Sequence, residues 1–93
     1  MKQALVIPIY QPNDKVVPFL KTFKNDDFAL LIVVDDGSGL AYQPVFDQIK
    51  ALKSFEVLSY PKNGGKGHAL KTAFRFLKDH HPEIQGVVTA DGE

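Results

Sequence analysis

The feature that most constrains the fold is the alternation of short apolar runs with longer segments whose apolar residues recur at helical spacing. Buried strands are expected at residues 4–9, 28–34, 55–60 and 85–90. Strands that alternate with helices form a mostly parallel sheet, because a right-handed crossover through a helix returns the chain to the same end of the sheet. The sequence therefore predicts a three-layer α/β/α domain with a mostly parallel four-stranded, Rossmann-like sheet.

The segments between the expected strands have the spacing of helices, with one apolar face each. Asn13 or Asp14 is expected to cap the first helix. The expected apolar stripes are Val16, Val17, Leu20 and Phe23; then Val45, Phe46, Ile49 and Leu52; then, over residues 67–80, Leu70, Ala73, Phe74 and Leu77. Lys71, Arg75 and Lys78 lie opposite the last stripe, so we expect a solvated basic face there.

Composition excludes several classes of protein. The chain has 93 residues and no cysteine, which excludes a disulfide scaffold and a cysteine-ligated metal module. Its longest apolar run, residues 28–34, is far shorter than the roughly 20 residues that cross a bilayer. Eleven basic and 11 acidic side chains give zero net charge, which argues against a nucleic-acid-binding domain. We therefore expect one domain of cytoplasmic character in which any anion site is local.

Polar or glycine-rich segments follow each expected strand. Tyr10 follows the first, Asp35 and Asp36 the second, residues 63–67 the third and Asp91 the fourth. Ligands of parallel α/β sheets bind beyond the carboxyl ends of the strands. These segments should therefore lie together at one edge of the sheet.

The segment Asn63-Gly64-Gly65-Lys66-Gly67 leads from an expected strand into an expected helix. Glycines at such a junction leave backbone N–H groups free to face an anion at the positive end of the helix, which predicts a phosphate contact. The pattern differs from a Walker A loop, because Gly67 follows Lys66 where Ser or Thr is required. The alternative is a flexible turn with solvated lysines at positions 62 and 66.

The acidic residues at the strand ends have two interpretations each. Asp36 could accept hydrogen bonds from a base or a ribose, whereas Asp35 could equally cap its own turn. Asp91 and Glu93 are one residue apart, so both could bind one Mg²⁺ or Mn²⁺ ion, or form a hydrated acidic pair. Tyr10 could stack on a base or simply pack at the strand exit.

Four segments in this order resemble a known family: VIPIY at 6–10, IVVDDGS at 32–38, NGGKG at 63–67 and VVTAD at 87–91. Together they resemble the N-terminal nucleotide-binding half of family-2 glycosyltransferases, which have the GT-A fold. The resemblance implies inverting transfer of a hexose from a UDP- or GDP-sugar with the help of Mg²⁺ or Mn²⁺. It places nucleotide-sugar contacts at Pro8, Tyr10, Asp36, Gly65, Lys66 and Asp91, and the metal ligands of the DxD motif at Asp91 and Glu93.

The NGGKG variant is similar to members that load sugars onto polyprenyl or dolichyl phosphate. That subtype implies a lipid-linked acceptor at the cytoplasmic face of a membrane. Gln11 replaces the family's usual Asn, and Glu93 replaces the second Asp of the DxD motif.

Family members are much longer and contain an acceptor site and a catalytic base. We therefore expect residues 1–93 to be a truncated nucleotide-sugar-binding subdomain that is inactive alone. We predict no catalytic residue within it. Surface exposed by truncation would favour self-association. The alternative is a non-catalytic module with the same fold that binds a nucleotide or a protein partner.

Overall fold

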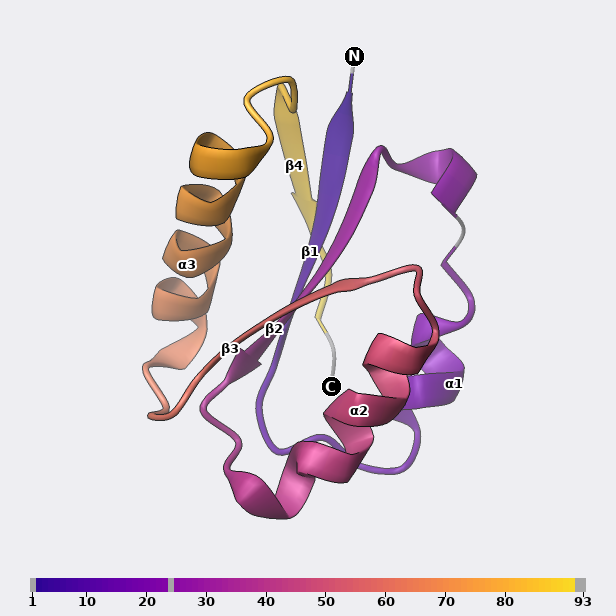
Figure 1. The fold of residues 1–93 in the computed structure, drawn as a ribbon, viewed down its shortest axis with the longest axis vertical. Coiled ribbons are helices and arrows are strands. Elements are labelled where there is room, and N and C mark those ends of the chain that lie inside the picture. Colours follow the sequence, from indigo (N-terminus) through magenta and orange to yellow (C-terminus); the bar gives the residue numbers. More distant parts are fainter. Residues whose placement is uncertain (1, 24, 92–93) are drawn as a thin grey trace.

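The computed structural model describes residues 2–23 and 25–91, which form one sheet between two helical layers (Figure 1). The strands are β1 (Gln3–Ile9), β2 (Leu30–Asp36), β3 (Glu56–Tyr60) and β4 (Gly86–Thr89). Helices α1 (Val16–Leu20) and α2 (Gln43–Ala51) cover one face, and α3 (Gly65–His80) covers the other. Two short 3₁₀ turns, η1 (Asn25–Asp27) and η2 (Leu40–Tyr42), precede β2 and α2.

The sheet has the order β3-β2-β1-β4, and every neighbouring pair is parallel. The first strand therefore lies between β2 and the last strand. Ile9 pairs with Asp35, and Asp36 pairs with Tyr60, so the carboxyl ends of β1, β2 and β3 are level at one edge. The three-layer, Rossmann-like architecture predicted from the sequence is confirmed.

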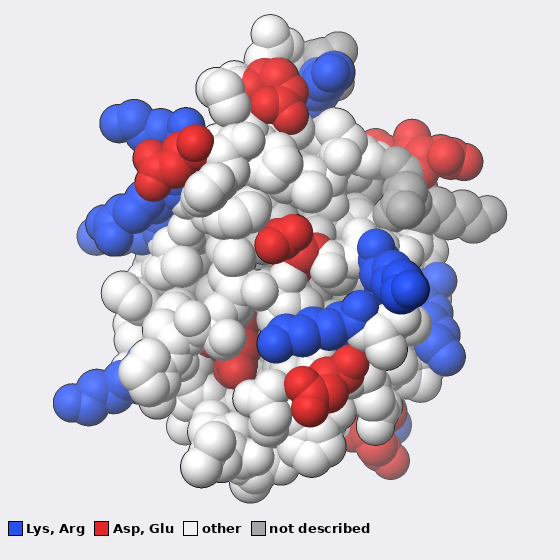
Figure 2. Space-filling model, in the orientation of Figure 1, with Lys and Arg blue, Asp and Glu red and all other residues white. Residues whose placement is uncertain are grey.

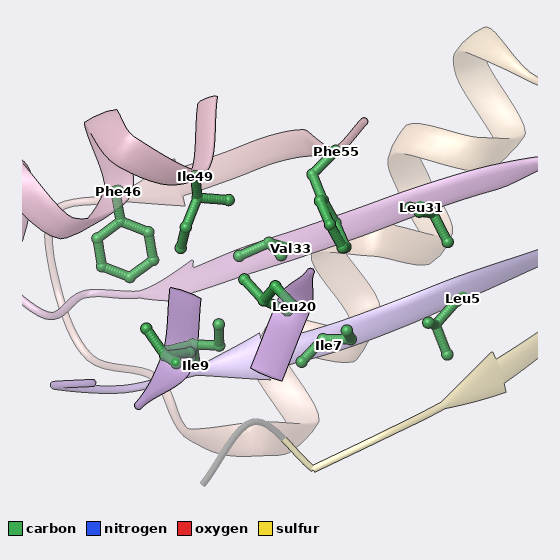
Figure 3. Packing of buried hydrophobic residues seen from close by; sticks show 10 residues of the cluster. Leu5, Ile7, Ile9, Leu20, Leu31, Val33, Phe46, Ile49 and Phe55 are labelled. Carbon is green, nitrogen blue, oxygen red and sulfur yellow. The ribbon is translucent and has the colours of Figure 1, made fainter. Parts of the chain in front are cut away.

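Side chains of β1 and β2 alternate between two cores, one on each face of the sheet. The core under α1 and α2 contains large aliphatic and aromatic side chains (Figure 3): Leu5, Ile7, Ile9, Val16, Leu20, Leu31, Val33, Phe46, Ile49 and Phe55. The core under α3 is built from smaller residues: Ala4, Val6, Ile32, Val34, Ala69, Ala73 and Leu77. Alanines on the inner face of α3 allow this helix to pack closely on the sheet.

Two expected helices differ from the structure. Helix α1 has only five residues, and Phe23, expected on its stripe, packs on the core from beyond its end. The expected cap at Asn13 or Asp14 is wrong, because Lys15 is the N-cap residue of α1 and no side chain caps this helix. Oδ1 of Asn13 instead accepts a hydrogen bond from the backbone N–H of Lys15 at 2.9 Å, just before the helix. In α3, Phe74 is 46% exposed, because the buried row runs through Ala69, Ala73 and Leu77 at four-residue spacing.

The end of β2 and the start of α3 each differ by two residues from the boundaries expected from the sequence. Strand β2 continues to Asp36 because Asp35 and Asp36 both pair with neighbouring strands. Helix α3 begins at Gly65, two residues before the expected start. Lys71, Arg75 and Lys78 are exposed, as predicted. Within residues 2–23 and 25–91, every helix is too short or too polar to cross a membrane.

Candidate functional site

The carboxyl ends of the strands surround a pocket of about 280 Å³, which we call the Asp36 pocket. Its lining combines the end of β1, the end of β2, the loop before α3, the first turn of α3 and the second residue after β4: Pro8, Ile9, Tyr10, Asp36, Asn63, Gly65, Lys66 and Asp91. All six residues predicted to contact a nucleotide-sugar are therefore brought together. Their binding roles stay predictions.

Asp36 is the central polar group of this pocket. Its side chain is on the α3 face of the sheet and the residue is only 4% exposed. Its Oδ1 accepts hydrogen bonds from the Tyr60 hydroxyl and from the backbone N–H of Gly64 at 3.0 Å. Its Oδ2 accepts one from Nδ2 of Asn63 at 3.1 Å. Asp36 thus holds residues 63–67, which we call the glycine loop, through Asn63 and Gly64. A carboxylate offers about four acceptor positions, so one position remains for a ligand.

The turn after Asp36 touches the glycine loop directly. Gly37 has φ +65°, and a Cβ at this position would lie 2.2 Å from the backbone nitrogen of Asn63. Only glycine permits so close an approach of two backbone segments. The position of the glycine loop is thus fixed by backbone contact as well as by the Asp36 carboxylate.

The glycine loop ends at the N-terminus of α3. Gly64 precedes the helix and no side chain caps it, so N–H groups of the first turn have no intrahelical partner. Lys66, in this turn, is exposed and lines the Asp36 pocket, whereas Lys62 does not line it. Backbone donors, the helix dipole and one lysine make this end of the pocket suited to an anion.

Tyr60 is a residue that the sequence analysis missed. The register of β3 against β2 places it beside Asp36, and its ring packs edge-on against His68 with the ring centroids 4.6 Å apart. Burial raises the pKa of Tyr60 above its ordinary value, and the hydrogen bond to Asp36 and the nearby carboxylate charges act in the same direction. A tyrosine at the end of the third expected strand was the available signal, but the register that pairs it with Asp36 cannot be read from the sequence.

Asp35 has a different role from its neighbour. Its side chain is on the α2 face, and its Oδ1 accepts a hydrogen bond from the backbone N–H of Ser38 at 2.9 Å. The Ser38 hydroxyl in turn accepts one from the backbone N–H of Gln11 at 2.8 Å, where Gln11 adopts a positive φ of 46°. Asp35 therefore caps its own turn, and this turn is tied to the segment that follows β1.

The metal ligands expected from the sequence are only partly within the described residues. Asp91 is exposed and lines the Asp36 pocket. Glu93 lies outside the described residues. In the described part of the chain, no three or more His, Cys, Asp or Glu residues are grouped to hold a metal ion. Because Mg²⁺ commonly uses one or two protein carboxylates and completes its shell with phosphate and water, Asp91 fits such a role only together with a phosphate ligand.

Charge on the surface is mixed. Figure 2 shows the described Lys and Arg side chains interspersed with Asp and Glu on the face in view, over large uncharged areas. His81, just past α3, lies 3.4 Å from the Glu83 carboxylate and packs with Phe76, so the histidines at this helix end have structural contacts.

Comparison by sequence found no matching family model and no matching curated protein. Comparison of structures found S. aureus TarS. A structure of its residues 1–349 is 21% identical with a TM-score of 0.68, over 99% of this chain and 27% of that chain. The same segment in complex with UDP-GlcNAc is 21% identical with a TM-score of 0.69, over 99% of this chain and 26% of that one. A further TarS structure gives 21% identity and a TM-score of 0.68, over 99% of this chain and 16% of that chain.

These matches show the fold. The chain spans about a quarter or less of the length of the structures it matches. Its three-layer α/β arrangement is that of a segment of TarS.

Proposed function

We propose that the Asp36 pocket binds the nucleoside diphosphate part of a nucleotide-sugar, and that the chain is the donor-binding part of an inverting family-2 glycosyltransferase. The observation that carries the proposal is the convergence of four sequence-distant segments on this one pocket. The fold shared with TarS, which was crystallised with UDP-GlcNAc, supports it.

Each lining residue has a chemical task in this proposal. Tyr10 is 38% exposed and offers an aromatic face on which a base can stack, next to Pro8. The remaining acceptor position of Asp36 suits an N–H of the base or a ribose hydroxyl. Gly65 and Lys66, at the start of α3, provide backbone N–H groups and a positive charge for the diphosphate. The pocket thus has an apolar end for a base and a donor-rich end for phosphates.

A divalent ion belongs to the proposal as a partner of Asp91. Mg²⁺ or Mn²⁺ held by Asp91, by Glu93 and by the diphosphate would offset the negative charge of the leaving nucleotide. In transfer, the bond between the anomeric carbon and the diphosphate oxygen breaks while an acceptor oxygen bonds to the same carbon. The acceptor must also lose a proton, and we assign no base for this step to residues 1–93.

The acceptor stays a prediction. The sequence resembles enzymes that use polyprenyl phosphate, but the TarS matches give no support to that subtype. A hexose as the transferred sugar and a location at the cytoplasmic face of a membrane are likewise predictions from the sequence alone.

The proposal is tested by calorimetric titration of the folded chain with UDP and with GDP, each with and without Mn²⁺. We expect one nucleotide to bind, with higher affinity in the presence of Mn²⁺. Asp91→Asn should remove the Mn²⁺ dependence, whereas Asp79→Asn, on an exposed position of α3 away from the Asp36 pocket, should leave it unchanged. Absence of binding by either nucleotide to the folded chain would contradict the proposal.

The non-catalytic alternative is favoured by one surface feature. β4 is an edge strand, and Val87 and Val88 are 36% and 38% exposed. These two side chains are on opposite faces of the sheet, so an apolar surface flanks the edge on both sides. Sedimentation at increasing concentration distinguishes the alternatives: self-association without nucleotide affinity would favour a partner-binding module over a donor site.

A further inference from the structure

A second pocket lies at the same edge of the sheet but on the opposite face. It has a volume of about 320 Å³, and we call it the Asp35 pocket. Asp35 and Ser59, paired neighbours at the ends of β2 and β3, form its polar side. The rest of its wall consists of Gly39, Leu40, Gln43, Tyr60 and Pro61. It is separate from the Asp36 pocket and shares no lining residue with it.

The carboxylate of Asp35 has one oxygen available to a ligand. The residue is only 7% exposed, and Oδ1 is used by the Ser38 backbone. Among the described residues, no donor is hydrogen-bonded to Oδ2, and no fully buried oxygen is without a partner. Oδ2 therefore reaches solvent, and it belongs to a nearly buried carboxylate in the wall of a pocket.

The polar groups of this pocket favour a ligand that donates hydrogen bonds. Gln43 donates one N–H of its Nε2 to Oδ1 of Asp47 at 2.9 Å, so its side-chain carbonyl oxygen and its second N–H remain for a ligand. Ser59 adds a hydroxyl, and Asp35 adds the only charge among the lining residues. A carboxylate with little access to water interacts more strongly with a cation than an exposed one does.

The rest of the wall is apolar. Leu40 is 89% exposed on η2 and lines the pocket together with Pro61. An exposed leucine in the same pocket as a nearly buried carboxylate gives a site with one apolar side and one negatively charged group. We propose that the Asp35 pocket binds a small organic cation, in which an ammonium or guanidinium group meets Asp35 and an aliphatic or aromatic body packs on Leu40 and Pro61.

The test is an NMR titration of the ¹⁵N-labelled chain with n-butylammonium chloride, followed at the amides of Gly39, Leu40 and Ser59. We expect saturable shifts at these amides. The same titration with 1-butanol, which has the alkyl chain without the charge, should give no saturable shift. Equal shifts with both compounds would overturn the proposal, since the carboxylate would then be irrelevant.

Three variants give the test its specificity. Asp35→Asn retains an acceptor for Ser38 while removing the charge, and it should weaken binding at least about tenfold. Leu40→Ser should also weaken binding, and it should leave the fold intact because the side chain is exposed. Asp79→Asn removes an exposed charge outside the pocket and should leave the affinity unchanged. Unchanged binding by Asp35→Asn, or equal weakening by Asp79→Asn, would overturn the assignment. Since the test uses no nucleotide, it is independent of the function proposed for the Asp36 pocket.

Discussion

Asp35 and Asp36 are adjacent in sequence, yet they act on opposite faces of the sheet. Asp35, on the α2 face, caps a turn only three residues away. Asp36, on the α3 face, accepts hydrogen bonds from Tyr60, Asn63 and Gly64, which are 24 to 28 residues away. Side chains of a strand alternate between faces, so one step along β2 separates a local contact from a long-range one.

The difference shows how one strand end can serve two pockets. Asp36 connects β2 to the glycine loop and thereby shapes the pocket for which we propose a nucleotide. Asp35 stabilises its own turn and leaves an oxygen facing a second pocket. Variants on the Asp36 side should therefore disturb distant segments, whereas variants on the Asp35 side should act locally.

The largest effect is expected from Gly37→Ala. The new methyl group would collide with the backbone of Asn63, and the φ of +65° adds strain, so we expect a loss of about 3–5 kcal/mol in the free energy of unfolding. Gly39→Ala is the matched control, because its φ is also positive but the space around its Cβ is open. It should cost only about 1–3 kcal/mol from backbone strain. Urea unfolding measures both, and equal losses would contradict the close approach of the two loops.

The next effect separates the two aspartates directly. Asp36→Ala leaves the Tyr60 hydroxyl and the Gly64 N–H without their acceptor, while Asn63 keeps its bond to the backbone carbonyl of residue 36, and it should cost about 2–4 kcal/mol. Asp35→Ala leaves only the Ser38 N–H without its acceptor and should cost about 1 kcal/mol. Asp36→Ala should also abolish nucleotide binding in the titration proposed above. Unchanged nucleotide affinity in a folded Asp36→Ala variant would remove Asp36 from the site.

The smallest effect concerns the hydroxyl of Tyr60. Tyr60→Phe removes one donor to Asp36 and should cost about 1 kcal/mol at neutral pH. Because the folded-state pKa of Tyr60 is raised, its contribution is fully present below the ordinary tyrosine pKa of about 10 and is lost as the pH rises further. The stability difference between wild type and variant should therefore shrink above pH 10. A difference that stays constant up to pH 11 would contradict the hydrogen bond.

Much of the fold could be predicted because the signals were local. The continuous apolar run of residues 28–34 and the strand–helix alternation sufficed for a parallel three-layer domain. The predictions that were wrong concern features that depend on how the helices pack on the sheet. Phe74 has the right spacing for a buried stripe, but the helix turns its alanines toward the sheet, and Phe74 stays half exposed. Helix α1 ends early, while Phe23 still reaches the core.

The candidate site could be predicted to the extent that it consists of strand ends. Tyr10, Asp36 and Asp91 follow from topology, because parallel strands end at one edge, whereas Pro8 came from the resemblance alone. The contacts of Tyr60 could not be predicted, because they depend on the register between β2 and β3. The Asp35 pocket was missed for a related reason. It forms where η2 lies near the end of β3, and no sequence motif indicates that these two segments are neighbours.

The strand order also has a consequence for biosynthesis. Residues Gln3–Val6 of β1 pair with β4, whose residues are the last of the four described strands to leave the ribosome. Until Gly86–Thr89 are made, that side of β1 presents unpaired backbone groups beside the apolar residues Ala4, Leu5 and Val6. An unpaired apolar strand edge is a template for intermolecular pairing. A nascent chain that stalls before β4 should therefore depend on chaperones, and completion of β4 is the step that makes β1 an interior strand.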